Sequence, residues 1–155
     1  LIDGSLHIGI IPAHRASQSL VYANLFTETM LLYCGARHPL FGADHAALTW
    51  DALRAWQFAG LGYHSPNMEL SHGARLPRKA TGFDQESIAT LILSGRYLGF
   101  LPDHYAESFE RQGLMQAVQP AQFFYPCQFV SVLRKSPQPP RAAQAFAQCL
   151  LAAHA

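Results

Sequence analysis

The residues best suited to bind a metal ion or to act as nucleophiles are eight histidines and three cysteines. None of them forms an H-x-H, H-E-x-x-H or C-x-x-C pair, the spacings that bring two ligands onto one metal ion. Ser94 precedes Gly95 instead of following a glycine, so segment 94–102 has no G-x-S-x-G nucleophile turn, and the sequence has no glycine-rich phosphate loop. We therefore expect no catalytic residue, no metal site and no cofactor.

The charge and the cysteines of the chain indicate which classes of partner and which cellular compartment are compatible with it. The chain has 155 residues, of which 50% are hydrophobic, and a formal net charge of +1 without a long run of like charges. Such a chain lacks the run of positive charges that binds successive phosphates of a nucleic acid. Cys34, Cys127 and Cys149 are odd in number and far apart, which favours a reducing compartment, the cytoplasm, over a disulfide framework. The apolar runs are shorter than the roughly 20 residues of a membrane span, so we expect no membrane partner.

The elements that position these residues alternate between short strands and helices. Strands are predicted from apolar runs that end at proline, glycine or polar turns, at residues 6–11, 20–25, 28–34, 56–61, 97–101 and 127–133. A polar stretch, 62–82, carries little periodicity. This alternation is typical of α/β units with parallel sheets.

Capping residues and apolar spacing mark the helices. Thr49 caps a short helix, and Asp84 caps a longer one that ends in a left-handed turn at Gly95. The apolar face of the longer helix comprises Ile88, Leu91 and Ile92.

Two further helices follow. One begins at Pro102 and closes at Gly113, and the last begins near Pro140. The last helix has an apolar stripe at Phe146, Cys149, Leu150 and Ala153. At the other end of the chain, residues 1–4 are typical of the final turn of a helix without its beginning, which indicates a fragment.

Four stretches, in their order and spacing, resemble the effector-binding domain of bacterial LysR-type transcriptional regulators. They are LIDGSLHIGI at 1–10, HPLF at 38–41, SGRYLGFLP at 94–102 and PPRAAQAFAQCLL at 139–151. The resemblance implies an α/β fold like that of type 2 periplasmic binding proteins, with two lobes joined by two crossing strands and a small effector in the cleft between them. SGRYLGFLP resembles the helix-Gly-strand-Pro segment that builds the second lobe, so it is neither a catalytic turn nor a phosphate cradle.

The resemblance also implies how the chain divides. The second lobe covers residues 27–131, and an incomplete first lobe covers 1–26 and 132–155, because the family has another strand and helix before it. A winged helix-turn-helix DNA-binding domain precedes these in the family and is absent from this chain. Two departures stand out, since Tyr97 replaces a glycine that the family often has and His7 replaces its usual aspartate.

The effector of this family contacts loops of both lobes. Carried over by position, the candidate residues are Pro12, His14 and Arg15 of the first lobe and His64, Ser65, Pro66 and Asn67 of the second, with Phe83 and Asp84 as the back wall. A cationic Arg15, two histidines and free amides at a helix end suit a small carboxylate, although Asp84 and Glu86 oppose it. The alternative is that these polar residues are solvated loop positions.

The resemblance favours a sensor module. Effector binding would shift lobe closure and reposition the missing DNA-binding domain of a homo-oligomeric regulator. A solute receptor of a transport system with the same fold is the alternative, although three unpaired cysteines are unusual outside the cytoplasm. An enzyme has the least support, because no nucleophile and base come together in the sequence.

Overall fold

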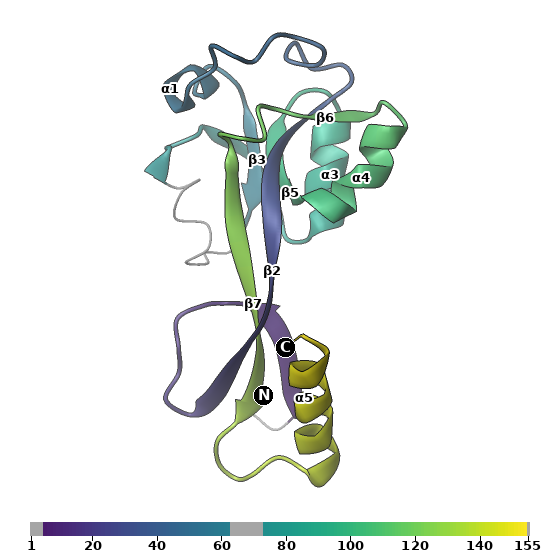
Figure 1. Cartoon of the computed structure of the whole chain (residues 1–155). Coiled ribbons are helices and arrows are strands. Elements are labelled where there is room, and N and C mark those ends of the chain that lie inside the picture. The colour runs from purple at the N-terminus through teal and green to yellow at the C-terminus, as the bar shows by residue number, and fades with distance from the viewer. Residues whose placement is uncertain (1–4, 63–72, 155) are drawn as a thin grey trace. The chain divides into compact units, whose positions relative to one another are not determined.

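The computed structural model describes residues 5–62 and 73–154, and these residues form two compact units. The first unit comprises residues 5–28 and 127–154, and the second comprises residues 29–62 and 73–126. Two strands, β2 (Leu20–Gly35) and β7 (Phe124–Arg134), begin in one unit and end in the other (Figure 1). Two connecting strands are what the resemblance implies, while its lobe boundaries stay a prediction.

The first unit is an antiparallel sheet with one helix. β1 (Ile8–Pro12) pairs with β7, from Ile8 opposite Leu133 to Pro12 opposite Phe129. The helix, α5 (Arg141–Ala153), follows β7 along the chain. The buried residues of this unit are Leu25, Cys127, Val130, Ser131, Val132, Ala143 and Ala147.

Two apolar surfaces of the first unit are exposed. Ile10 is 43% exposed, because β1 is the last strand at its end of the sheet order. On α5, Phe146 is 51% exposed and Cys149 is exposed, so the apolar stripe through these residues is not the buried face of the helix. The buried face is formed instead by Ala143 and Ala147. The alanine face and the Phe146 face both have the apolar spacing of a helix. Only the alanine face, with its small side chains, is buried in the folded unit.

β2 is one strand of 16 residues, so the predicted break between residues 25 and 28 is wrong. The polar residues that suggest a turn are satisfied by the neighbouring strand. Thr27 Oγ1 donates to Gln128 Oε1 at 2.8 Å, and Gln128 Nε2 donates to the carbonyl of Phe26 at 3.0 Å. The rings of Phe26 and Phe129 stack beside these bonds, with centroids 5.0 Å apart. Contacts between the strands therefore keep this segment extended.

The second unit contains a mixed sheet. Its remaining strands are β3 (Phe58–Leu61), β4 (Arg78–Gly82), β5 (Leu98–Pro102) and β6 (Met115–Ala117). β3 is parallel to β4 and β5, whereas β2 is antiparallel to β5 and β6. The prediction of parallel sheets therefore holds only for β3, β4 and β5.

Neither β4 nor β6 is predicted from the sequence. β4 has the sequence RKATG and is mostly exposed at the edge of the sheet, so it has no alternating apolar pattern. β6 has three residues, too few for a period to be recognised. Both strands exist because neighbouring strands supply their hydrogen-bond partners.

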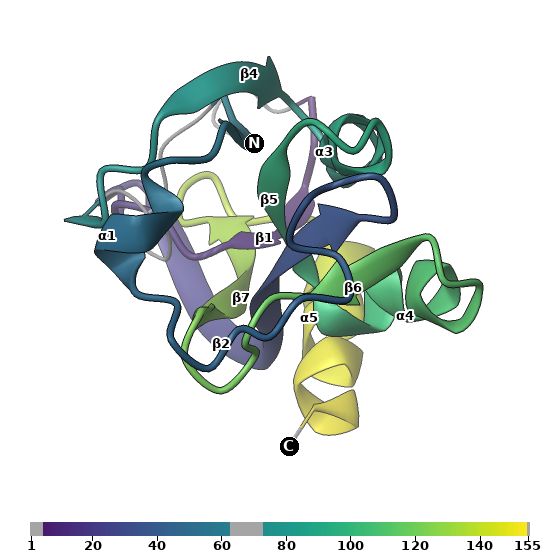
Figure 2. The same ribbon diagram turned by 90° about the horizontal axis from the view of Figure 1, so that it is seen from above.

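The helices of the second unit among residues 29–62 and 73–126 include α1 (Trp50–Leu53), α3 (Gln85–Leu93) and α4 (Asp103–Arg111). Both predicted side-chain caps are confirmed, because Thr49 accepts from the amide of Ala52 and Asp84 accepts from the amide of Ser87. α3 and α4 pack against β5 (Figure 2). None of the described helices is both long and apolar enough to span a bilayer.

The segment from Gly95 to Pro102 connects α3, β5 and α4. Gly95 has the predicted left-handed conformation, with φ of 75°. A Cβ atom at this position would also lie 2.6 Å from the Cβ of Arg37. Pro102 ends β5 and is at the same time the N-cap of α4. This segment is therefore structural, as predicted.

Candidate functional site

The first group of candidate residues lies at the end of β1. Pro12 is the last residue of that strand and is partly buried opposite Phe129, while His14 and Arg15 are exposed in the loop that follows. Nδ1 of His14 lies 2.7 Å from the carbonyl oxygen of Arg15. His14 and Arg15 therefore follow a strand, as the sequence predicts, and Pro12 ends it.

Tyr22 holds this loop in place. Its hydroxyl accepts a hydrogen bond from the amide of Ser17 at 3.0 Å, and its ring meets the imidazole of His14 edge to face, with centroids 5.7 Å apart. The amide of Ala13 also donates to the carbonyl of Gln128 at 2.7 Å. The loop is therefore fixed at several points, and the Arg15 side chain is exposed on it.

The second group, His64, Ser65, Pro66 and Asn67, lies outside the described residues. The chain before it is described as far as Gly62, whose amide donates to the carbonyl of Gly82 at 2.8 Å. This bond holds the carboxyl ends of β3 and β4 together. Ligands of open α/β sheets bind at this edge, beyond the carboxyl ends of parallel strands.

The third group, Phe83 and Asp84, lies between β4 and α3. Phe83 is 74% exposed. Its ring lies against the backbone of Gly62, where a Cβ atom would be 2.5 Å from Cε1 of Phe83. An exposed aromatic side chain at a strand end is suited to contact a ligand.

Asp84 changes the expected electrostatics of this helix end. Its carboxylate accepts from the amide of Ser87 at 2.7 Å, and hydrogen bonds from the Ser87 side chain and, to a smaller extent, from this amide lower the pKa of Asp84. The helix terminus therefore already carries its own anion, with Glu86 also in the first turn. The amide of Ser87 is therefore not free to receive a ligand carboxylate.

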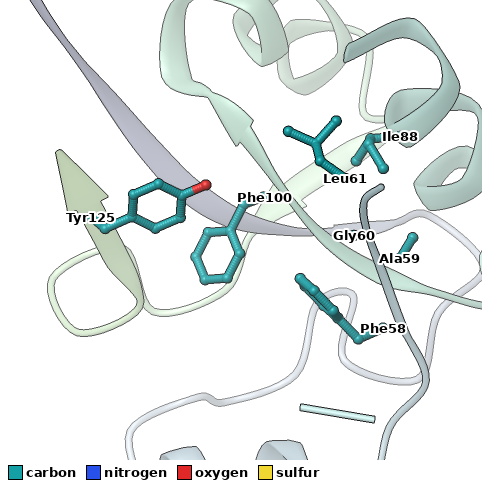
Figure 3. Close-up of a pocket in the computed structure, with 7 residues that line it drawn as sticks. All are labelled: Phe58, Ala59, Gly60, Leu61, Ile88, Phe100 and Tyr125. Atoms are coloured by element: carbon teal, nitrogen blue, oxygen red, sulfur yellow. The ribbon is translucent and has the colours of Figure 1, made fainter. Parts of the chain in front are cut away.

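A hollow along β3 was missed from the sequence. It is lined by Phe58, Ala59, Gly60, Leu61, Ile88, Phe100 and Tyr125, all from the second unit (Figure 3). The rings of Phe58 and Phe100 meet at 5.9 Å, and those of Phe100 and Tyr125 at 5.0 Å. Only about 10 Å³ remains for solvent, roughly the space of one water molecule. These lining residues come from β3, α3, β5 and β7, so no local pattern identifies them.

The hollow forms because two strands separate. β3 pairs with β4 along its whole length but with β5 only at Phe58 and Ala59. β5 continues its pairing with β2 as far as Pro102. The ends of β3 and β5 therefore diverge, and Ile88 of α3 closes one side of the space between them.

Metal-binding and nucleophilic groups do not assemble in the described part of the chain. Across residues 5–62 and 73–154, no three His, Cys, Asp or Glu side chains are grouped so that they could hold a metal ion. Cys34 is fully buried, and this burial raises the pKa of its thiol to about 12. Such a thiol is a buried core side chain and not an activated nucleophile.

Comparison with protein families gives one match over the whole chain. A family model described as the LysR substrate binding domain matches residues 1–155. The HTH-type transcriptional activator BauR of Pseudomonas aeruginosa is 29% identical over 150 residues, which are 97% of this chain and 49% of BauR. The chain thus spans about half the length of this relative.

Solved structures share the fold at low sequence identity. The CcmR regulatory domain of Synechocystis PCC6803, in complex with 2-PG, has a TM-score of 0.73 at 16% identity, covering 99% of this chain and 76% of that one. A reduced form of OxyR from N. meningitidis has a TM-score of 0.73 at 15% identity, covering 98% and 72%. Full-length CbnR complexed with its target DNA has a TM-score of 0.69 at 17% identity, covering 100% and 55%.

These likenesses show the fold, a mixed α/β fold of the type 2 periplasmic-binding-protein kind with an open sheet. The family match over the whole chain adds the function of the domain. The chain belongs to the LysR substrate-binding domain family, whose members are transcriptional regulators, and it is an effector-sensing regulatory domain.

Proposed function

We propose that this chain senses a small molecule for a LysR-type transcriptional regulator and that binding alters DNA binding and transcription through a DNA-binding domain outside the chain. The observation that carries the proposal is the family match over residues 1–155. It is supported by the activator BauR and by the CbnR structure with its target DNA. A cytoplasmic location and a homo-oligomeric whole protein follow from this proposal. The alternative of a transport receptor gains no support from these regulators.

The proposed effector-contacting residues are those predicted from the sequence. They are Pro12, His14, Arg15, Phe83 and Asp84, together with His64, Ser65, Pro66 and Asn67 outside the described residues. Two observations support the choice. The loop after β1 exposes a cation, and Phe83 is an exposed aromatic residue at the carboxyl end of β4. Loops at such strand ends are where α/β sheets bind ligands.

A thermal-shift screen of the 155-residue chain tests effector binding. The library contains small carboxylates, aromatic acids and amino acids. A ligand at 100 times its Kd should stabilise the folded chain by about 2.7 kcal/mol, because it binds only the folded form. We expect Arg15→Ala and Ser65→Ala to reduce the shift and the control Arg141→Ala, at the exposed start of α5, to keep it. A shift that survives both substitutions would remove these residues from the site.

A DNA-binding experiment tests the regulatory function. The whole protein that contains this chain is mixed with the promoter region upstream of its own gene, and its affinity and footprint are measured with and without a hit from the screen. We expect the ligand to change one of them, since effector and DNA binding are coupled. Unchanged affinity and footprint at saturating ligand would contradict the proposal.

A further inference from the structure

The side chain of Arg78 lies along β3, the strand that lines the hollow, although its backbone is opposite the first residue of that strand. It is the first residue of β4 and is opposite Phe58, the first residue of β3. Its Nη1 nevertheless donates to the carbonyl of Leu61, the last residue of β3, at 2.9 Å. The side chain therefore runs along β3 and brings the guanidinium to the carboxyl end of that strand.

Gly60 provides the path for this side chain. A Cβ atom on Gly60 would lie 2.9 Å from Cδ of Arg78 and 3.0 Å from Cε1 of Phe58. Gly60 also lines the hollow, so the aliphatic part of Arg78 lies against one of the lining residues. Any larger residue at position 60 would push the arginine away from the backbone.

A bulge in β4 accompanies this arrangement. Arg78 is opposite Phe58 and Ala80 is opposite Ala59, so Lys79 is an additional residue in the ladder. Paired residues point to the same face of a sheet, and bulges commonly redirect side chains next to functional sites. Arg78 thus lies on the face that carries Phe58 and, through the pairing of Phe58 with Leu98, also Phe100.

The charge of Arg78 is available to a ligand. The residue is exposed, and among the described residues its guanidinium has one hydrogen bond and no ion pair. A guanidinium has five N–H donors, so most of them make no hydrogen bond to the described residues. The start of α3 cannot take this role, since Asp84 and Glu86 make it acidic.

We propose that Arg78 binds the carboxylate of a short aliphatic monocarboxylate whose apolar end rests on the rim of the hollow formed by Phe58, Leu61 and Phe100. The inference rests on the proposed effector-sensing function and names the ligand class. One negative charge suits the site, because Arg78 supplies one cation. A short chain suits it, because the hollow has room for about one water-sized group.

NMR titration of the 155-residue chain tests this assignment, with propionate and butyrate as probes and the neutral butyramide as the matched uncharged probe. We expect butyrate to move the amide resonances of Gly60, Leu61 and Phe100 and butyramide to bind at least about tenfold more weakly, because it lacks the charge. Arg78→Gln should weaken butyrate binding by about tenfold to a hundredfold and leave butyramide binding unchanged.

Two further variants distinguish the effect of the Arg78 charge from the effect of where its guanidinium lies. Gly60→Ala keeps the arginine but displaces it, and it should weaken butyrate binding as well. The control Arg96→Gln removes an exposed arginine before the amino end of β5, where Nε donates to Gln57 Oε1 at 3.2 Å, and should bind butyrate like the wild type. The melting temperature of each variant without ligand shows that it is folded.

Two results would overturn the assignment. One is that Arg78→Gln binds butyrate as tightly as the wild type, and the other is that neither acid moves the resonances of β3 and β5. Either result leaves the sensing function standing if the wider screen finds a ligand of another class. A screen without any ligand would count against the sensing function itself.

Discussion

His38 is a buried histidine whose surroundings disfavour its charged form. The residue is 4% exposed, and its ring lies 5.0 Å from that of Trp56. Its Nδ1 accepts a hydrogen bond from the amide of Leu40 at 3.2 Å. Burial lowers the pKa of His38 below its ordinary value of 6.5. A proton on Nδ1 would remove the acceptor and place a charge in the core.

This pKa shift predicts a pH dependence of stability. The unfolded chain takes up a proton at His38 at a higher pH than the folded chain does, so the contribution is complete above pH 6.5 and is lost as the pH falls toward the folded pKa. We expect the free energy of unfolding to decrease between pH 7 and pH 5, and to decrease less in His38→Asn, whose amide oxygen can accept from Leu40. Denaturant titrations at several pH values measure both slopes. Equal slopes would show that His38 does not carry the dependence.

At the scale of elements, α3 joins the candidate site to the core. Its amino end carries Asp84, while Ile88 and Ile92 are buried against β5. The close approach depends on Gly99, where a Cβ atom would lie 3.0 Å from Cδ1 of Ile92. The sequence groups Leu91 with these two residues, but Leu91 is only partly buried. The buried face of α3 is therefore narrower than the apolar face that the sequence predicts for this helix.

A pair of substitutions in α3 checks this difference. Ile92→Ala should cost about 2 to 5 kcal/mol of unfolding free energy, because it removes buried methylenes and leaves a cavity. Leu91→Ala should cost roughly half as much, since part of its side chain already contacts water. Chemical denaturation measures both. If the two variants lose the same free energy, or Ile92→Ala loses less than about 1 kcal/mol, α3 is not packed as described.

At the scale of the whole molecule, the two units differ in how much apolar surface they bury. All five residues of β5 in the second unit are buried, whereas none of the residues of β1 in the first unit is fully buried. The first unit also exposes large apolar side chains, including Leu6, Val21 and Leu151. Units with less buried surface open at lower free energy than the global transition.

Native-state hydrogen exchange should therefore separate the units. We expect the amides of β1 to exchange through an opening of lower free energy than those of β5, with the difference persisting at low denaturant concentration. A ligand bound only to the second unit should slow exchange in β5 more than in β1. Identical opening free energies for β1 and β5 would mean that the chain unfolds as one cooperative unit.

Local interactions explain which features the sequence by itself determined. The caps at Thr49 and Asp84 and the left-handed turn at Gly95 depend on residues within a few positions, so their residue types predict them. The loop after β1, with His14 and Arg15, is predicted for the same reason, because a proline ends the strand.

Only the tertiary structure decided the features that depend on distant residues. The continuity of β2 requires hydrogen bonds to Gln128, more than a hundred positions away, and β4 exists through its pairing with β3. α5 has two apolar faces, and tertiary packing determines which of them is buried. The position of the Arg78 guanidinium depends on Gly60 and Leu61 of another strand. No sequence period records such contacts, because their free energy arises only when the strands come together.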